Sequence, residues 1–371
     1  MPDEAHARHP PAGARGREPG GSRAGDAMKE TRFVVIGENV HTSRIVLRKG
    51  KRFAVENGLE GVTFETLDGE SGVLPISDAM RATKAYDEGR IKHIALAVDA
   101  AMGRGGDPDL GLEYLRRVVA DQERTGAHYL DVNVDEISLR TAEQRAAMEW
   151  LVGYVGSLTA LPISVDSSDI TVIEAGLAAA RRAGDAPPIL NSASLERTEA
   201  VELAVEYGAR AIVTAAGADG MPSSAGERID NASRMVERAL GAGLRIGDLF
   251  VDPLVFPISV DSSFGLHTLE AIRTLRERYG PEIHITGGMS NVSFGIPARK
   301  LMNAAFINLA VEAGADSGII DPVMNPPASV FSVDRDSEAY GLAEDTLLGR
   351  DEMCMAYIMA WRKGRLDTPV G

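Results

Sequence analysis

The sequence predicts an α/β fold in which eight parallel strands and their helices close into a (β/α)8 barrel. Short runs of β-branched and other apolar residues end in a polar residue or a glycine, and a helical stretch follows each run. Continuous apolar strands that alternate with helices are typical of a parallel sheet covered on both faces. The first turn after a strand reads GENVHTSR rather than G-x-G-x-x-G, which disfavours an open dinucleotide-binding sheet. Eight strands in one domain of this size favour the barrel.

Each element can be placed on the chain in order. The strand pattern occurs in eight runs: RFVVIG (32–37), YLDVNV (129–134), PISVD (162–166), PPILN (187–191), AIVTAA (211–216), LFVDP (249–253), EIHITGG (282–288) and SGIIDP (317–322). Between them, apolar residues recur at three- and four-residue spacing, which is typical of amphipathic helices. The clearest predicted helices cover 108–126, 141–158, 168–184 and 195–208, and several of them close on a glycine.

Two segments stand outside this repeat. Residues 1–27 are rich in Pro, Gly and Arg and lack an apolar period, so we predict a disordered tail without chemistry. Residues 28–371 are predicted to form a single barrel domain with an insertion at about 44–110. The insertion includes the basic run RIVLRKGKRF and the helical stretch RIKHIALAVDAAM. We interpret the basic run either as a solvated face or as a binding surface for a substrate tail or a partner.

Composition excludes several classes of protein. The formal net charge of −15 disfavours nucleic-acid binding, because phosphate contacts need clustered cations. No apolar run approaches the roughly 18 residues that a membrane span requires. The single cysteine, Cys354, excludes an internal disulfide framework and a multi-cysteine metal site, and the seven histidines are scattered. We therefore predict a cytoplasmic protein without a bound metal.

Polar residues stand at the carboxyl ends of nearly all predicted strands, which is where barrel active sites lie. Single residues of this kind often cap a helix or make a turn, and Asp169 and Asp321 fit that role. The whole set converging on one mouth instead predicts a binding site, and paired carboxylates and amides suit a flat heterocycle rich in N–H donors. The set comprises Glu38, Asn39, Asp131, Asn133, Asp166, Asn191, Thr214, Asp252, Asn291 and Asp321.

Five motifs carry a family resemblance. LDVNV, SVDSSD, ILNSASLE, VDPLVFP and GGMSNVSFGIPAR occur in the order and at the spacings found in pterin-binding methyltransferases. The sequence thus resembles methyltetrahydrofolate:corrinoid methyltransferases and the folate domain of cobalamin-dependent methionine synthase, over about residues 32–40 and 110–330. This resemblance implies a dihydropteroate synthase-like TIM barrel. It also implies methyl transfer between N5-methyltetrahydrofolate and the cobalt of a corrinoid (cobalamin) protein, in either direction, with tetrahydromethanopterin as an alternative to folate.

The resemblance also implies roles for particular residues. Asn291 matches the asparagine that contacts the pterin N5 and, with Asp252, is the predicted catalytic pair. Glu38 is followed by Asn39, where the family often has an arginine. Arg299 matches a basic position of the family, and the resemblance does not specify its role. The predicted pterin-binding residues are Asp131, Asn133, Asp166, Asn191, Asp252, Asn291, Glu38 and Arg299.

The implied chemistry suits an amide. Asn291 can donate a hydrogen bond to N5 as the N–CH3 bond breaks, without the desolvation cost of a buried cation. Small residues at Gly287, Gly288 and Ser290 are expected to keep the surface low for an approaching corrinoid.

Partners and alternatives follow from what the sequence lacks. It contains neither a DxHxxG corrinoid motif nor a cysteine set for zinc and homocysteine, so a separate corrinoid protein is the expected partner. The resemblance further implies a homodimer. One alternative is a dihydropteroate synthase, for which Arg299 and Lys300 form only a thin basic cluster. The other is a non-catalytic pterin-binding subunit, in which Asn291 would be dispensable.

Overall fold

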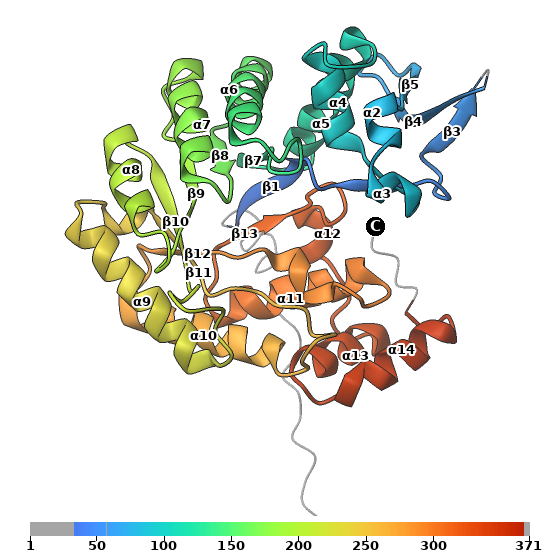
Figure 1. The fold of residues 1–371 in the computed structure, drawn as a ribbon. Coiled ribbons are helices and arrows are strands. Elements are labelled where there is room, and N and C mark those ends of the chain that lie inside the picture. The colour runs from blue at the N-terminus through green and yellow to red at the C-terminus, as the bar shows by residue number, and fades with distance from the viewer. Residues whose placement is uncertain (1–32, 57, 367–371) are drawn as a thin grey trace, which may run out of the picture.

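A closed eight-stranded parallel barrel forms the body of the protein (Figure 1). The computed structural model describes residues 33–56 and 58–366, so the predicted tail at 1–27 lies outside the described residues. The sheet has the order β12-β11-β10-β9-β8-β7-β1-β13. Its edges join through the Ile319 amide, which donates to the Gly287 carbonyl oxygen at 2.9 Å, and the Asp316 amide, which donates to that of Ile285 at 3.3 Å. The predicted (β/α)8 fold is therefore confirmed.

All eight predicted strands are present, with two differences at the site. The strands are β1 (Val34–His41), β7 (Tyr129–Asn133), β8 (Ile163–Asp166), β9 (Ile189–Ala193), β10 (Arg210–Thr214), β11 (Leu249–Asp252), β12 (His284–Ile285) and β13 (Ser317–Ile320). Glu38 and Asn39, which we expected after the first strand, lie within β1, between the residues where its register shifts. β12 is shorter than predicted, and Asn291 lies beyond it in the 3-10 helix η2 (Met289–Ser293).

The helices begin where side chains can satisfy free backbone amides. Asp107 Oδ1 accepts hydrogen bonds from the Asp109 and Leu110 amides ahead of α5, and Asp169 Oδ1 accepts one from Thr171 at 2.8 Å ahead of α7. The capping role expected of Asp169 is thus confirmed. The helices around the barrel are α5 (Pro108–Arg124), α6 (Thr141–Leu158), α7 (Ile170–Ala183), α8 (Glu199–Tyr207), α9 (Ala225–Gly241), η1 (Ile246–Asp248), α10 (Phe264–Tyr279) and α11 (Arg299–Ala313).

Further helices follow the last strand. They are α12 (Pro327–Phe331), α13 (Glu338–Leu347), η3 (Glu352–Cys354) and α14 (Met355–Arg362), and α13 packs against α11. No helix in 33–56 or 58–366 is long and apolar enough to cross a membrane.

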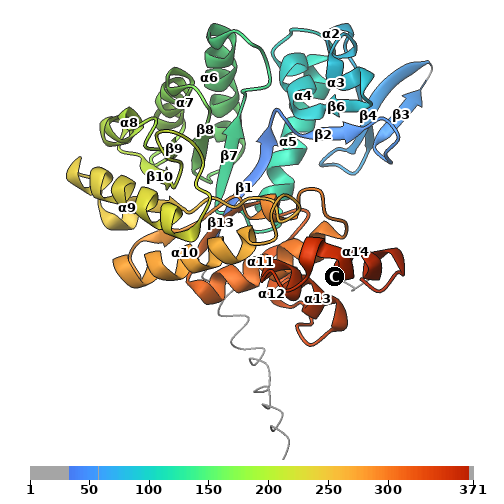
Figure 2. The ribbon, with the colours of Figure 1, turned by 60° about the horizontal axis from the view of Figure 1, so that its bottom comes forward.

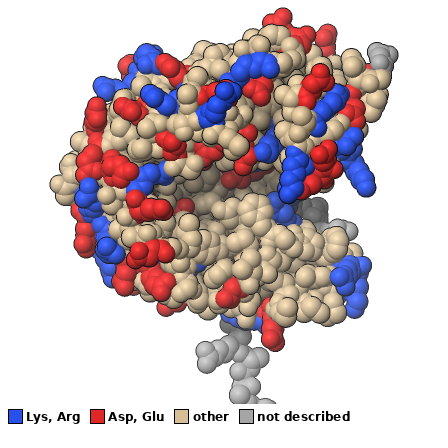
Figure 3. Space-filling model, viewed as in Figure 1, with Lys and Arg blue, Asp and Glu red and all other residues tan. Residues whose placement is uncertain are grey.

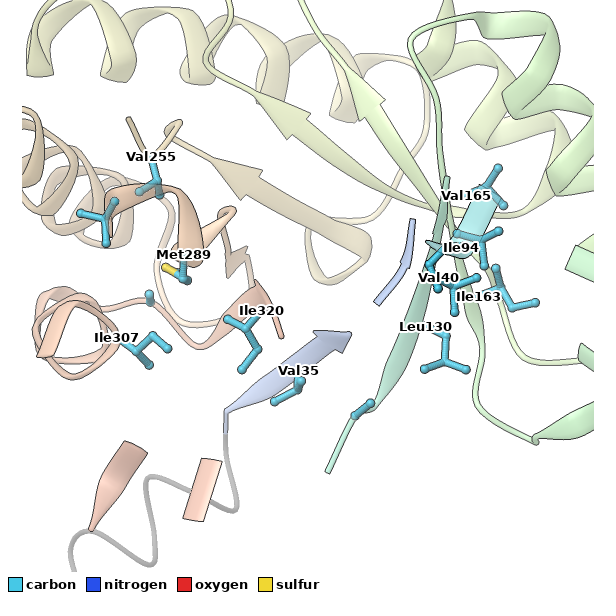
Figure 4. Packing of buried hydrophobic residues seen from close by; sticks show 14 of the residues in the cluster. Val35, Val40, Ile94, Leu130, Ile163, Val165, Val255, Met289, Ile307 and Ile320 are labelled. Atoms are coloured by element: carbon cyan, nitrogen blue, oxygen red, sulfur yellow. The ribbon is translucent and has the colours of Figure 1, made fainter. Parts of the chain in front are cut away.

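The segment between β1 and α5 is a folded subdomain beside the barrel mouth (Figures 1 and 2). It contains an antiparallel three-stranded sheet, β3-β4-β5, and a two-stranded sheet, β2-β6. Ile94 and Leu96 of α4 are fully buried, and Figure 4 shows Ile94 close to Val40 of β1. Each such side chain contributes about 1.5–3 kcal/mol on burial, which anchors the subdomain to the barrel. Its elements are β2 (Ile45–Leu47), β3 (Phe53–Glu56), β4 (Leu59–Glu65), β5 (Ser71–Pro75), α2 (Asp78–Arg81), α3 (Lys84–Asp87), β6 (Arg90–Lys92) and α4 (His93–Ala101).

The barrel interior is built in layers. One buried cluster consists of Ile36, Tyr129, Ile189, Ile212 and Phe250, each from a different strand. Side chains alternate along a strand, so the residue two positions later on each strand faces the interior again. These later positions are polar, and this second layer forms the floor of the mouth: Glu38, Asp131, Asn191, Thr214 and Asp252.

Candidate active site at the barrel mouth

Two carboxylates and two amides form a hydrogen-bonded cluster on neighbouring strands. Asn191 Nδ2 donates to Asp131 Oδ1 at 3.1 Å, and Asn133 Nδ2 donates to Asp166 Oδ2 at 2.9 Å. The strand register places Asp166 beside both Asn133 and Asn191. The structure therefore brings together four residues that we predicted to bind a pterin.

The two carboxyl groups of this cluster have higher pKa values than ordinary carboxyl groups. Burial raises the pKa of Asp131 to about 6. Burial and the nearby Asp131 carboxyl raise the pKa of Asp166 well above its usual range. Two carboxylates this close in a low-dielectric site resist ionising together. A ligand that donates N–H groups to them would stabilise the ionised form.

Asp252 and Gly287 fit against each other at the end of β11. Asp252 is buried, and its Oδ1 accepts a hydrogen bond from the Leu254 amide at 2.7 Å. Burial raises the pKa of Asp252 to about 6. A Cβ atom at Gly287 would lie 3.0 Å from Val255 Cγ2 and 3.2 Å from Asp252 Oδ1. Glycine at this position leaves the space that the carboxyl group occupies.

Gly288 makes the equivalent space for Asn291. A Cβ atom at Gly288 would lie 2.7 Å from Asn291 Nδ2, which is closer than van der Waals contact. The glycine pair therefore accommodates two site side chains. The low surface that we expected for an approaching corrinoid stays a prediction. Within the described part of the chain, the Asn291 side-chain amide has no hydrogen-bond partner, and it lines a cavity of about 460 Å³.

Arg299 supports the turn that carries Asn291. Its Nε donates to Ser293 Oγ and one of its terminal nitrogens donates to the Ser290 carbonyl oxygen, both at 2.9 Å. The guanidinium also lies over the Phe294 ring, 4.5 Å from its centroid. Arg299 therefore has a structural role: it contacts residues near both ends of the 3-10 helix η2 and stabilises it.

Arg44 is a site residue that sequence reasoning missed. It forms an ion pair with Asp321 Oδ2, and its Nη1 lies 4.0 Å from Glu38 Oε1. Asp321 also accepts a hydrogen bond from Asn39 Nδ2 at 3.0 Å, in addition to the turn contacts that we expected of it. Burial raises the pKa of Glu38 to about 7, although Arg44 acts in the opposite direction. Arg44 lies far from Asp321 in sequence, and no local pattern signals their pairing.

The cavity at the mouth joins this group to Asn291. Its lining includes Glu38, Arg44, Ser290, Asn291 and Arg299. Figure 3 shows the face hollowed between the subdomain and the opposite half of the barrel, with acidic atoms inside and basic atoms at its edge. Across 33–56 and 58–366, no group of three or more His, Cys, Asp or Glu side chains is arranged to hold a metal ion.

Comparison with known proteins identifies the family. The profile of the pterin-binding enzymes matches residues 105–321. The methylcorrinoid:tetrahydrofolate methyltransferase of Eubacterium limosum is 30% identical over 261 residues, covering 68% of this chain and 89% of that enzyme. The methionine synthase of Mycobacterium tuberculosis is 31% identical over 218 residues, covering 55% of this chain but only 18% of that longer enzyme.

A solved structure also resembles the chain. The dihydropteroate synthase of Yersinia pestis, determined with a sulfonamide drug, covers 90% of this chain and 95% of its own, with a TM-score of 0.47 and 14% identity. The two sequence relatives share 30% and 31% identity with this chain over their aligned residues. The chain belongs to the pterin-binding enzyme family and is a methyltransferase.

Proposed function

We propose that this enzyme transfers a methyl group between N5 of tetrahydrofolate and the cobalt of a corrinoid carried by a separate protein, in either direction. One observation carries the proposal: the unpaired amide of Asn291 lines the 460 Å³ cavity together with Glu38, a carboxyl group whose pKa burial raises to about 7. The names of the relatives, a methylcorrinoid:tetrahydrofolate methyltransferase and methionine synthases, support the choice of substrates.

The carboxyl and amide cluster is proposed to bind the pterin edge. Asp166, Asn191 and Asp252 form hydrogen bonds with its amino group and ring nitrogens. Asn133 holds Asp166 in place, Asp131 holds Asn191, and the Leu254 amide holds Asp252. Ionised carboxylates are strong acceptors for paired N–H donors. The raised pKa of Asp252 then falls on binding, because the ligand stabilises its charged form.

Asn291 is the proposed catalytic residue. In the forward direction the N5–CH3 bond breaks, its electron pair stays on N5, and the methyl carbon bonds to cobalt(I) of the corrinoid substrate. A proton reaches N5, and the Asn291 amide stabilises the charge that develops there. Since this hydrogen bond strengthens as the bond breaks, it lowers the barrier rather than only tightening binding. Arg299 and Gly288 keep the amide in place through the contacts described above.

The proposal also includes the partners of the enzyme. A separate corrinoid protein docks at the mouth, and the enzyme works as a homodimer in the cytoplasm. Sedimentation of the purified enzyme, alone and with a corrinoid protein, measures both associations.

A reconstitution assay tests the proposed reaction against its alternatives. Methyltetrahydrofolate and cob(I)alamin are mixed with the enzyme, and the reverse mixture starts from methylcobalamin and tetrahydrofolate. Spectral conversion in either mixture supports the proposal. Formation of dihydropteroate from a dihydropterin diphosphate and 4-aminobenzoate, without methyl transfer, would instead establish the synthase. Pterin binding without either reaction, also with a corrinoid protein present, would favour the non-catalytic subunit.

A further inference from the structure

A second cavity adjoins the first on the side of the inserted subdomain. It has a volume of about 260 Å³ and shares four lining residues with the larger cavity. The shared residues are Arg44, Arg52, His93 and Asp321. The rings of Phe64 and Tyr114 line only the second cavity. A ligand with its pterin beside Asn291 can therefore extend an outer part toward the subdomain.

Most charges around the second cavity are already compensated. Arg117 pairs with Asp121 at 2.8 Å and with Glu65 at 3.7 Å, and Arg44 pairs with Asp321. Arg52 differs, because no carboxylate of the described residues lies within ion-pair distance of it. Arg52 is exposed, and its guanidinium donates a hydrogen bond to the Tyr114 hydroxyl oxygen. Arg52 thus offers an uncompensated positive charge to both cavities.

His93 adds a neutral donor beside Arg52. The Tyr114 hydroxyl lies 2.8 Å from His93 Nδ1. Because this hydroxyl accepts from Arg52, its own proton points toward Nδ1, which leaves the His93 proton on Nε2. Burial, with Arg52 and Arg44 nearby, lowers the pKa of His93 well below its usual value, so the ring stays neutral. His93 is buried and lines both cavities, and its Nε2 has no hydrogen-bond partner among 33–56 and 58–366.

These groups suit a carboxylate at the end of an aromatic linker. A guanidinium and an imidazole N–H both donate to carboxylate oxygens, and the Phe64 and Tyr114 rings offer an apolar wall for a flat ring. Arg52, Phe64 and His93 all lie outside the residues that match the family profile. They belong to the segment between β1 and α5, beside the barrel mouth.

We propose that the inserted subdomain binds the glutamyl tail of the folate substrate, with Arg52 and His93 as the donors to its carboxylates. The inference rests on the proposed function, since it extends the same ligand outward from the pterin pocket. It also assigns the basic run of the insertion a role at Arg52, in place of a merely solvated face.

Calorimetry with two ligands tests the proposal. Tetrahydrofolate carries the tail, whereas 6-methyltetrahydropterin has the same pterin edge without it. We expect Arg52→Ala to weaken tetrahydrofolate binding about tenfold or more, as for loss of a charged hydrogen bond, and to leave 6-methyltetrahydropterin binding unchanged. Lys51→Ala is the matched control, because Lys51 is an exposed neighbouring cation that lines neither cavity. It should bind both ligands as the wild type does.

Other results would overturn the inference. Equal weakening of both ligands by Arg52→Ala would mean that the residue supports the pocket rather than the tail. No weakening of either would mean that the tail lies elsewhere. If the wild-type enzyme binds neither ligand, the proposed function itself fails, and this result is distinct because it does not depend on Arg52.

Discussion

Gly288→Ala, which adds one methyl group, should greatly reduce the rate of methyl transfer while leaving the fold intact. The new Cβ would lie 2.7 Å from Asn291 Nδ2, whereas ordinary contact begins at 3.4 Å. The amide must therefore move by about 0.7 Å or more. Misplacement of a catalytic group by about 1 Å costs on the order of 100-fold in rate, or about 2.7 kcal/mol of barrier. We expect Gly288→Ala to lose methyl transfer by roughly this factor.

Stability should change little in the same variant. Gly288 has φ −69°, which alanine adopts without strain, and Asn291 can swing away. We expect the free energy of unfolding to stay within about 1 kcal/mol of wild type, and pterin binding to persist. Gly153→Ala is the control, because its Cβ would meet no atom within 4 Å.

Single-turnover kinetics with cob(I)alamin and methyltetrahydrofolate, alongside thermal unfolding, measure both quantities. Wild-type turnover by Gly288→Ala would refute the reasoning, because the position of the Asn291 amide would then not matter.

Three further outcomes follow from the site. Pterin binding near pH 6 should release about half a proton from Asp252, since this carboxyl has a pKa of about 6 before binding and is ionised in the complex. Calorimetry in buffers of different ionisation enthalpy detects this release, and proton uptake would contradict it. Asp166→Asn should raise the melting temperature at about pH 8 but weaken pterin binding. The pKa of the Asp166 carboxyl is higher in the folded than in the unfolded protein, so its contribution to stability is full below its ordinary pKa and is lost as pH rises. The difference in melting temperature between the variant and the wild type should therefore shrink toward about pH 4. Arg299→Lys should slow methyl transfer about tenfold with a smaller effect on pterin affinity, because lysine cannot replace both hydrogen bonds of Arg299. Lys300→Ala is the control, and equal rates of methyl transfer in the two variants would contradict the role assigned to Arg299.

The strands and the polar ends of the strands were predictable because they depend on local pattern. Short apolar runs define the strands, and side-chain alternation places a polar residue two positions beyond an apolar interior residue, as in Ile36 and Glu38 or Phe250 and Asp252. This two-residue offset is itself a sequence signal for the residues of the interior layer.

The remaining features depend on contacts between distant residues. Arg44 follows β1 and meets Asp321, which follows the neighbouring strand β13 at the other end of the barrel sequence. Gly288 is required by the side chain of Asn291 rather than by a turn. Likewise, the cavity around Arg52 exists only because the subdomain packs against α5, where Tyr114 lies. Neither spacing nor composition encodes such juxtapositions, so the sequence predicted the polar residues at the strand ends but not what positions them.

The most direct test of the central claim separates binding from chemistry at Asn291. Methyltetrahydrofolate binding to the wild type and to Asn291→Ala is measured by calorimetry, and each complex is then mixed with cob(I)alamin while its spectrum is followed. The proposal predicts methylcobalamin formation by the wild type, and loss of about 100-fold or more of that rate in Asn291→Ala with binding largely kept, as for removal of one donor to a developing charge. Equal rates in the two proteins would contradict the assignment of Asn291 as the catalytic residue.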